Sequence, residues 1–144
     1  MKFVLIDHIV EQTADRIVAV KQVSLAEEYL QDHFPSFPVL PGVLMIEAMT
    51  QAARAMLAPR GNPRLVLGEV KALKFGNMVR PGEQLEIEVG LVKDAGDGSY
   101  VCRGTGRVRR AGQAQTDAAG DATAVSGRFT MRPVSEWVAR RTED

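Results

Sequence analysis

Residues 41–57 restrict the fold of this chain more than any other segment. Pro41 suits the first position of a helix, where the N–H that proline lacks would have no carbonyl to bind. A helix of roughly 17 residues follows, about 25 Å long, and apolar side chains surround most of it. A helix with so little polar surface has to be buried on nearly every side. In a chain of 144 residues, the simplest way to bury it is inside a curved sheet.

The rest of the chain favours strands, because β-branched residues and period-two alternation recur along it. The predicted strands are residues 3–10, 16–24, 64–76, 83–93, 99–110 and 122–132. Ser24 and Glu27 have the spacing of a capping box, which predicts a short helix to about Leu30. The polar stretch 111–121 is expected to be a loop, and 134–141 an amphipathic tail.

Long strands around one buried helix predict an α+β fold with an antiparallel sheet, in a single domain over residues 1–144. Exposed sheet edges favour pairing with a second copy of the chain, so we also expect a dimer.

The composition argues against several classes of protein. Hydrophobic residues make up 45% and charged residues 25%, which is typical of neither a disordered nor a membrane protein. Eighteen basic and eighteen acidic side chains balance, and without a basic arm we expect no nucleic-acid partner. Cys102 is the only cysteine, which favours a reducing compartment. The apolar start, residues 1–6, is too short for a signal peptide or a membrane span, so we expect a cytoplasmic protein.

A stiff loop carries the first candidate for chemistry. Pro35, Pro38 and Pro41 recur at every third position, and each restricts its own backbone and that of the residue before it. His33 stands at the start of this loop and can exchange a proton near neutral pH. The alternative is that His33 is structural or simply solvated. We favour the chemical role because the loop returns directly to the start of the helix that bears Glu47.

Glu47 belongs to a narrow polar stripe on the otherwise apolar helix. Thr50, Gln51 and Arg54 fall within about 60° of it around the helix axis. The stripe alone could equally face solvent, but the apolar surroundings favour a buried site. A carboxyl group kept away from water retains its proton more readily, so Glu47 can act as an acid.

Gly42, next to the helix start, supplies a third element. The free N–H groups and the dipole of a helix N-terminus favour negative charge that develops on an oxygen. A base, an acid and such a donor are what α-proton abstraction with loss of a β-hydroxyl group requires. Two histidines and one cysteine do not make a convincing zinc site, and no Walker loop or Gly-x-Ser-x-Gly elbow occurs. We therefore expect no metal and no cofactor.

Residues 33–51 closely resemble the signature of the FabZ-type 3-hydroxyacyl-[acyl-carrier-protein] dehydratases. This run reads His-Phe-Pro-Ser-Phe-Pro-Val-Leu-Pro-Gly-Val-Leu-Met-Ile-Glu-Ala-Met-Thr-Gln. A weaker likeness covers residues 3–7, Lys74-Phe75 and residues 81–85. The resemblance implies a hot-dog fold, in which an antiparallel sheet wraps a long central helix. It also implies a homodimer whose two active sites lie at the subunit interface; many members of the family assemble as trimers of dimers.

The resemblance further implies residue roles. His33 would be the catalytic histidine, and Glu47 of the other subunit its carboxyl partner. Gly42 would supply the N–H that polarises the thioester carbonyl, and Gln51 would help to hold Glu47 at the substrate site. The implied function is a lyase that converts (3R)-3-hydroxyacyl-[acyl-carrier-protein] to the trans-2-enoyl thioester in fatty acid or related lipid biosynthesis.

Two alternatives remain open at this level. Where the family tends to read Phe-Arg-Arg-Pro-Val, residues 75–79 read Phe-Gly-Asn-Met-Val, and the missing arginines suggest a coenzyme A thioester or a specialised lipid as substrate. A module that binds acyl thioesters without catalysis needs no acid–base pair, so the joint presence of His33, Glu47 and Gly42 argues against it.

Overall fold

The computed structural model describes residues 3–61, 64–111 and 122–134. Its single α-helix within these ranges is α1 (Gly42–Leu57), which is preceded and followed by the short 3-10 helices η1 (Glu28–Gln31) and η2 (Ala58–Arg60). The strands are β1 (His8–Gln12), β2 (Arg16–Gln22), β3 (Leu65–Phe75), β4 (Gln84–Asp94), β5 (Tyr100–Arg109) and β6 (Thr123–Pro133). The predicted 111–121 loop and 134–141 tail lie almost entirely outside the described residues.

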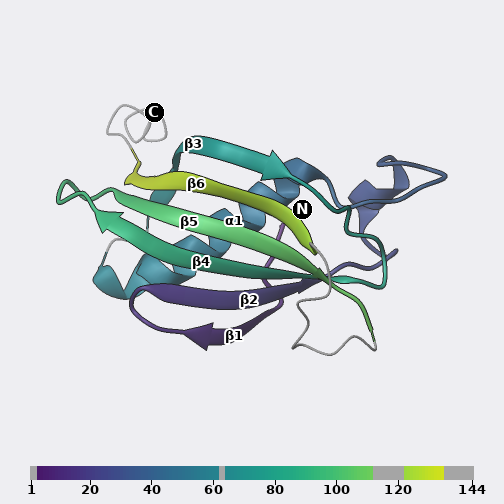
Figure 1. Cartoon of the computed structure of the whole chain (residues 1–144), viewed down its shortest axis with the longest axis horizontal. Coiled ribbons are helices and arrows are strands. Elements are labelled where there is room, and N and C mark those ends of the chain that lie inside the picture. Colours follow the sequence, from purple (N-terminus) through teal and green to yellow (C-terminus); the bar gives the residue numbers. More distant parts are fainter. Residues whose placement is uncertain (1–2, 62–63, 112–121, 135–144) are drawn as a thin grey trace, which may run out of the picture.

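The strands form one sheet in the order β1-β2-β4-β5-β6-β3, and every neighbouring pair is antiparallel. Helix α1 runs across one face of this sheet (Figure 1). The predicted α+β architecture, with an antiparallel sheet around one long helix, is therefore confirmed. Strand β3 follows α1 in the chain but lies at the sheet edge, next to the last strand β6.

The core lies between α1 and the inner face of the sheet. In β4 the alternate residues Leu85, Ile87 and Val89 are all fully buried, as the period of two predicts. Gly104 of β5 lets the helix approach closely, because a Cβ atom there would lie 2.4 Å from Sδ of Met49. No helix in the described ranges is long and apolar enough to span a membrane.

Two local predictions differ from the structure. Helix α1 begins at Gly42, with Pro41 as its N-cap and not as its first helical residue. The capping-box contact does form, since the Glu27 carboxylate accepts the N–H of Ser24 at 3.1 Å. However, Oγ of Ser24 accepts the N–H of Ala26 in a tight turn and Glu27 stays extended, so only one 3-10 turn follows.

The first predicted strand is also shorter than expected, since β1 starts at His8 and not at residue 3. Residues 3–5 leave the sheet because their backbone bonds to the side chain of Gln51 on α1. The buried side chain of Leu5 anchors this N-terminal strap, residues 3–7, in the core.

Candidate active site

The loop between η1 and α1 fixes the ring of His33. Its Nδ1 lies 2.9 Å from the carbonyl oxygen of Val39, and a carbonyl can only accept a hydrogen bond. Nδ1 therefore carries a proton, and in the neutral ring Nε2 keeps the lone pair that a base needs. The loop is tied to itself, because Val39 N–H donates to the carbonyl of His33 at 2.9 Å. The His33–Phe34 peptide bond is cis, and the two rings stack with centroids 4.4 Å apart.

His33 and the start of α1 line the same pocket, of about 420 Å³. The other walls are mostly apolar and include Val43, Phe75 and Met78. Gly42 lies directly under the Phe75 ring, since a Cβ atom at this position would be 2.7 Å from Cε1 of Phe75. The N–H of Gly42 belongs to the first helical turn, where N–H groups have no carbonyl partner within the helix. The structure thus brings together two of the predicted site residues.

Glu47 is half-buried and lies outside the lining of this pocket. Its Oε1 accepts a hydrogen bond from Nε2 of Gln51 at 3.2 Å. Gln51 in turn bonds the N-terminal strap, accepting from Leu5 N–H at 2.8 Å and donating to the carbonyl of Phe3 at 2.9 Å. Glu47 and Gln51 therefore form a hydrogen-bonded pair, but one chain alone does not bring Glu47 into the His33 pocket.

The rest of the polar stripe makes contacts within the protein. Thr50 is buried, and its hydroxyl donates to the carbonyl of Ile46 at 3.0 Å. Nε of Arg54 donates to the carbonyl of Leu65 at 3.0 Å. The stripe therefore does not simply face solvent. Among the residues in the three described ranges, no group of three or more histidine, cysteine or acidic side chains is placed to hold a metal ion.

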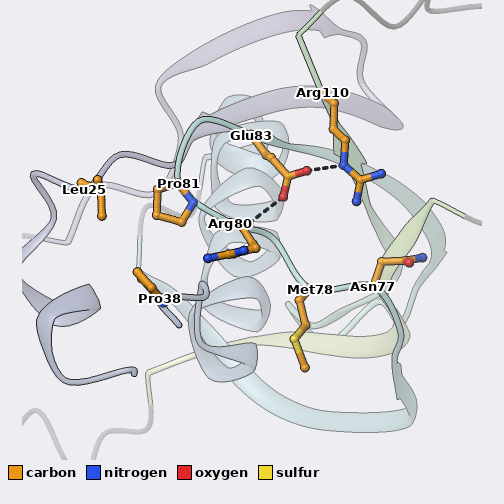
Figure 2. A pocket seen from close by; sticks show the side chains of 8 residues that line it. All are labelled: Leu25, Pro38, Asn77, Met78, Arg80, Pro81, Glu83 and Arg110. Atoms are coloured by element: carbon orange, nitrogen blue, oxygen red, sulfur yellow. Dashed lines mark hydrogen bonds and ion pairs between the residues drawn. The ribbon is translucent and has the colours of Figure 1, made fainter. Parts of the chain in front are cut away.

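A second cleft, of about 670 Å³, adjoins the first and shares Asn77 and Met78 with it. Two arginines line it, and sequence reasoning did not single them out (Figure 2). The guanidinium carbon of Arg80 lies 3.9 Å from the centroid of the Phe37 ring, while Arg110 pairs with Glu83. Arg80 lies between residues 75–79, which depart from the family pattern, and residues 81–85, which resemble it, and this position was the available signal.

Solved structures with the same architecture identify the class of fold to which this chain belongs. One is the dehydratase heterocomplex ApeI:P from Xenorhabdus doucetiae, with a TM-score of 0.65 and 20% identity over 92% of this chain and 99% of that chain. Another is a hypothetical thioesterase with coenzyme A from Streptococcus pneumoniae TIGR4, with a TM-score of 0.63 and 12% identity over 89% and 85% of the two chains. Likeness at such low identity concerns the fold alone, and that fold is the hot-dog fold.

The chain belongs to the ApeI-like dehydratase family, whose model, ApeI dehydratase, matches residues 9–114. It is also similar to 3-hydroxyacyl-[acyl-carrier-protein] dehydratases FabZ, as the sequence signature predicted. It is 41% identical to that of Koribacter versatilis (strain Ellin345) over 93 residues, which are 61% of this chain and 60% of the relative. It is 34% identical to that of Lactococcus lactis subsp. lactis (strain IL1403) over 117 residues, 72% of this chain and 81% of the relative. The match thus spans about three fifths of the first relative's length and about four fifths of the second's.

Proposed function

We propose that this protein is a hydro-lyase that dehydrates (3R)-3-hydroxyacyl-[acyl-carrier-protein] to trans-2-enoyl-[acyl-carrier-protein], in cytoplasmic fatty acid or related lipid biosynthesis. The family membership and the FabZ relatives support the reaction class. The observation that carries the proposal is the hydrogen bond from His33 Nδ1 to Val39, which leaves Nε2 as a base in a pocket shared with Gly42.

The residues divide the reaction as follows. Nε2 of His33 takes the α-proton of the thioester, while the N–H of Gly42 stabilises the negative charge that develops on the carbonyl oxygen. Glu47 gives its proton to the β-hydroxyl group, the C–O bond breaks and water leaves with formation of the C=C bond. Return of the proton from His33 to Glu47 restores the starting state.

Glu47 reaches this pocket from a second copy of the chain. Large apolar side chains surround the pocket and stay exposed in the single chain, including Val43 at 70%, Met78 at 60% and Phe75 at 53%. A contiguous apolar surface of this kind is typical of an interface between proteins. The outer edge of β3 pairs with no other strand among the described residues, and it is a further surface on which a second copy can pair. We infer a homodimer with shared sites, which can assemble further into a trimer of dimers.

The arginines of the second cleft help to identify the carrier of the acyl thioester, which is either a carrier protein or coenzyme A. Arg80 places positive charge next to the pocket, beside the Arg110–Glu83 ion pair, where an acidic carrier protein would approach. A coenzyme A thioester is the second candidate, because its phosphates suit the same arginines. In addition, Gly76 and Asn77 stand where FabZ proteins tend to have two arginines, so this chain lacks two charges that would favour docking of an acidic carrier protein. Turnover of the same 3-hydroxyacyl group on each carrier separates the two candidates.

The first test is His33→Asn, whose side-chain amide can still donate to Val39 but has no basic nitrogen in place of Nε2. We expect turnover of 3-hydroxyacyl-carrier protein, followed by mass spectrometry, to fall by roughly 10²- to 10⁴-fold with an unchanged melting temperature. His8→Asn, at the other histidine of the chain, is the matched control and should keep full activity. Full turnover by His33→Asn would refute the proposal.

The second test is complementation between variants. His33→Asn and Glu47→Gln should each be inactive alone. If they are unfolded together and refolded, mixed dimers contain one site with both native residues, so about a quarter of wild-type activity should return. No recovery from a mixture shown to contain mixed dimers would mean that the two residues do not share a site across subunits.

A further inference from the structure

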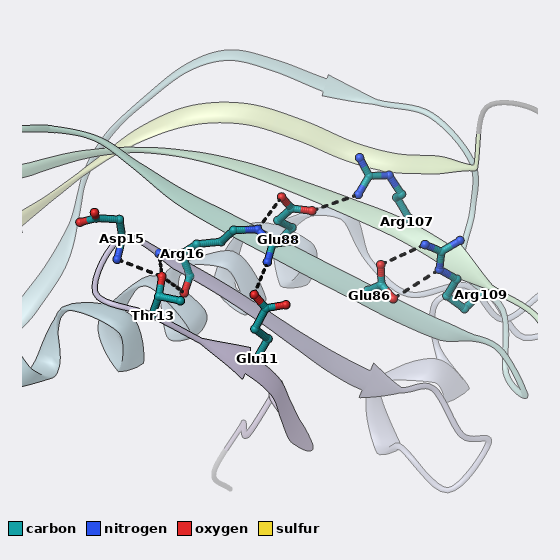
Figure 3. Close-up of polar contacts among 8 residues, drawn as sticks. All are labelled: Glu11, Thr13, Asp15, Arg16, Glu86, Glu88, Arg107 and Arg109. Carbon is teal, nitrogen blue, oxygen red and sulfur yellow. Dashed lines mark hydrogen bonds and ion pairs between the residues drawn. The ribbon is translucent and has the colours of Figure 1, made fainter. Parts of the chain in front are cut away.

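The face of the sheet turned away from α1 is divided into two halves with different charge patterns. Where β1, β2 and β4 meet the C-terminal half of β5, acidic and basic side chains alternate and neutralise one another (Figure 3). Glu88 pairs with Arg16 at 3.1 Å and with Arg107 at 3.5 Å, and Glu86 pairs with Arg109 at 3.0 Å. This is the usual arrangement, because opposite charges on neighbouring strands attract.

The β5-β6-β3 side breaks this pattern. Arg103 of β5 lies directly opposite Arg128 of β6, and Arg128 lies directly opposite Lys71 of β3. Three positive charges therefore stand side by side in one row across three strands. Like charges in directly opposite positions destabilise a sheet, so such a row calls for a negatively charged group to offset it.

The adjacent row on the same face adds donors. Thr105 lies opposite Ser126, and Ser126 lies opposite Lys74. Together with Lys71, Arg103 and Arg128, these side chains line a hollow of about 380 Å³, a size in the range of small-molecule sites. The kink that shapes the hollow is an irregularity in β3 between Lys71 and Lys74, where Ala72 has φ = +53°.

Little of this charge is neutralised within the chain. Lys71 lies 3.6 Å from Glu69, and both side chains are well exposed. For Lys74, Arg103 and Arg128, the described residues provide no ion-pair partner within 4.0 Å. Four cations and two hydroxyl groups around a hollow form a set of donors suited to a group with several negative charges. Arginine in particular binds phosphate oxygens in pairs of parallel hydrogen bonds.

We propose that this hollow, which we call the β3-β6 anion site, binds a small compound with a diphosphate or phosphate ester group. The site lies on the sheet face opposite the helix and uses none of the residues of the dehydration mechanism. It can hold its ligand whether or not the proposed reaction is correct.

The test is binding of inorganic pyrophosphate to the whole protein, measured by isothermal titration calorimetry and as a shift in melting temperature. We expect binding to wild type and a rise in melting temperature, and each of Arg103→Gln and Arg128→Gln should weaken the affinity by about tenfold or more. Without pyrophosphate, Arg128→Gln should melt no lower than wild type, because the central charge of the row is gone. Arg107→Gln is the matched control on the same strand, and it should bind pyrophosphate like wild type although it loses its pairing with Glu88.

Three results would overturn the proposal. The first is no pyrophosphate binding by wild type beyond the effect of potassium chloride at equal ionic strength. The second is unchanged binding in both arginine variants. The third is that the arginine variants bind pyrophosphate like wild type and lose only their co-sedimentation with anionic phospholipid vesicles. That result would identify the patch as a membrane contact. His33→Asn separates this site from the active site, since it should abolish dehydration and leave pyrophosphate binding intact.

Discussion

The side-chain amide of Gln51 donates a hydrogen bond to Oε1 of Glu47 across 3.2 Å. The orientation of this amide is fixed, because its oxygen accepts the N–H of Leu5 at 2.8 Å and its nitrogen also donates to the carbonyl of Phe3. The N-terminal strap therefore determines, through one side chain, where the Glu47 carboxyl lies.

Replacing Gln51 should affect both stability and activity. Gln51→Ala leaves the N–H of Leu5 without its partner, so we expect the free energy of unfolding to fall by about 1–3 kcal/mol in urea titrations. With Glu47 free to move, kcat should fall by roughly 10- to 100-fold. Thr50→Val is the control, since it removes a hydrogen bond from the same helix without touching Glu47. Full kcat in Gln51→Ala would show that Glu47 needs no such support.

Gly42→Ala should change the pocket more than the stability. The new Cβ atom would press on the far end of the Phe75 ring, which is exposed and can swing away, so we expect the free energy of unfolding to change by no more than about 1 kcal/mol. The displaced ring then obstructs the pocket, and kcat/KM should fall by roughly tenfold or more. Adding Phe75→Leu should recover part of this loss. If kcat/KM of the double variant is no higher than that of Gly42→Ala alone, displacement of the Phe75 ring does not explain the loss.

Gly76→Ala, by contrast, should damage the fold. Its Cβ atom would lie 2.5 Å from the carbonyl oxygen of Thr123, and this backbone is held by hydrogen bonds to Gly76 and Asn77. We expect a loss of about 1–3 kcal/mol in thermal or urea unfolding. Gly68→Ala, where the obstacle is only the flexible side chain of Arg132, should lose less than Gly76→Ala. The same contact excludes an arginine at position 76, so a stable Gly76→Arg variant would be strong evidence against this explanation.

Stability should decline at high pH because of Cys102. Burial raises the pKa of its thiol to about 11, from 9.0 for a free thiol. The native state thus keeps a proton that the unfolded chain releases, so this contribution is complete below pH 9.0 and is lost as the pH rises through about 11. The difference is worth about 2–3 kcal/mol. Cys102→Ala should flatten the fall in urea midpoint between pH 9 and 11 relative to wild type, and identical slopes would contradict the assignment.

Much of the architecture could be predicted from local patterns. The apolar circumference of residues 42–57 required a buried helix, and the alternation of Leu85, Ile87 and Val89 required a strand with one buried face. The N-terminal strap could not be predicted in this way. Its apolar residues look like a strand, but Leu5 is buried through a long-range contact with Gln51, and no local pattern encodes such a contact.

The candidate site shows the same division. The closely spaced prolines did indicate a loop that holds His33 still, and the helix start at Gly42 does lie in the same pocket. The charge row of Lys71, Arg128 and Arg103 was not foreseen, because it depends on the register of three strands that are distant in sequence. Arg80 was missed for a similar reason, since its contact with Phe37 joins two loops.

The sheet order also bears on how the chain folds during synthesis. Among the described strands, β3 finds its backbone partner only in β6, the last strand to leave the ribosome. The eleven residues of β3 must therefore wait, without a backbone partner in the sheet, while β4 and β5 are translated. A nascent or prematurely terminated chain that lacks β6 would present this edge to other chains and to chaperones. Truncations near residue 123 should thus yield aggregates, not a smaller working enzyme.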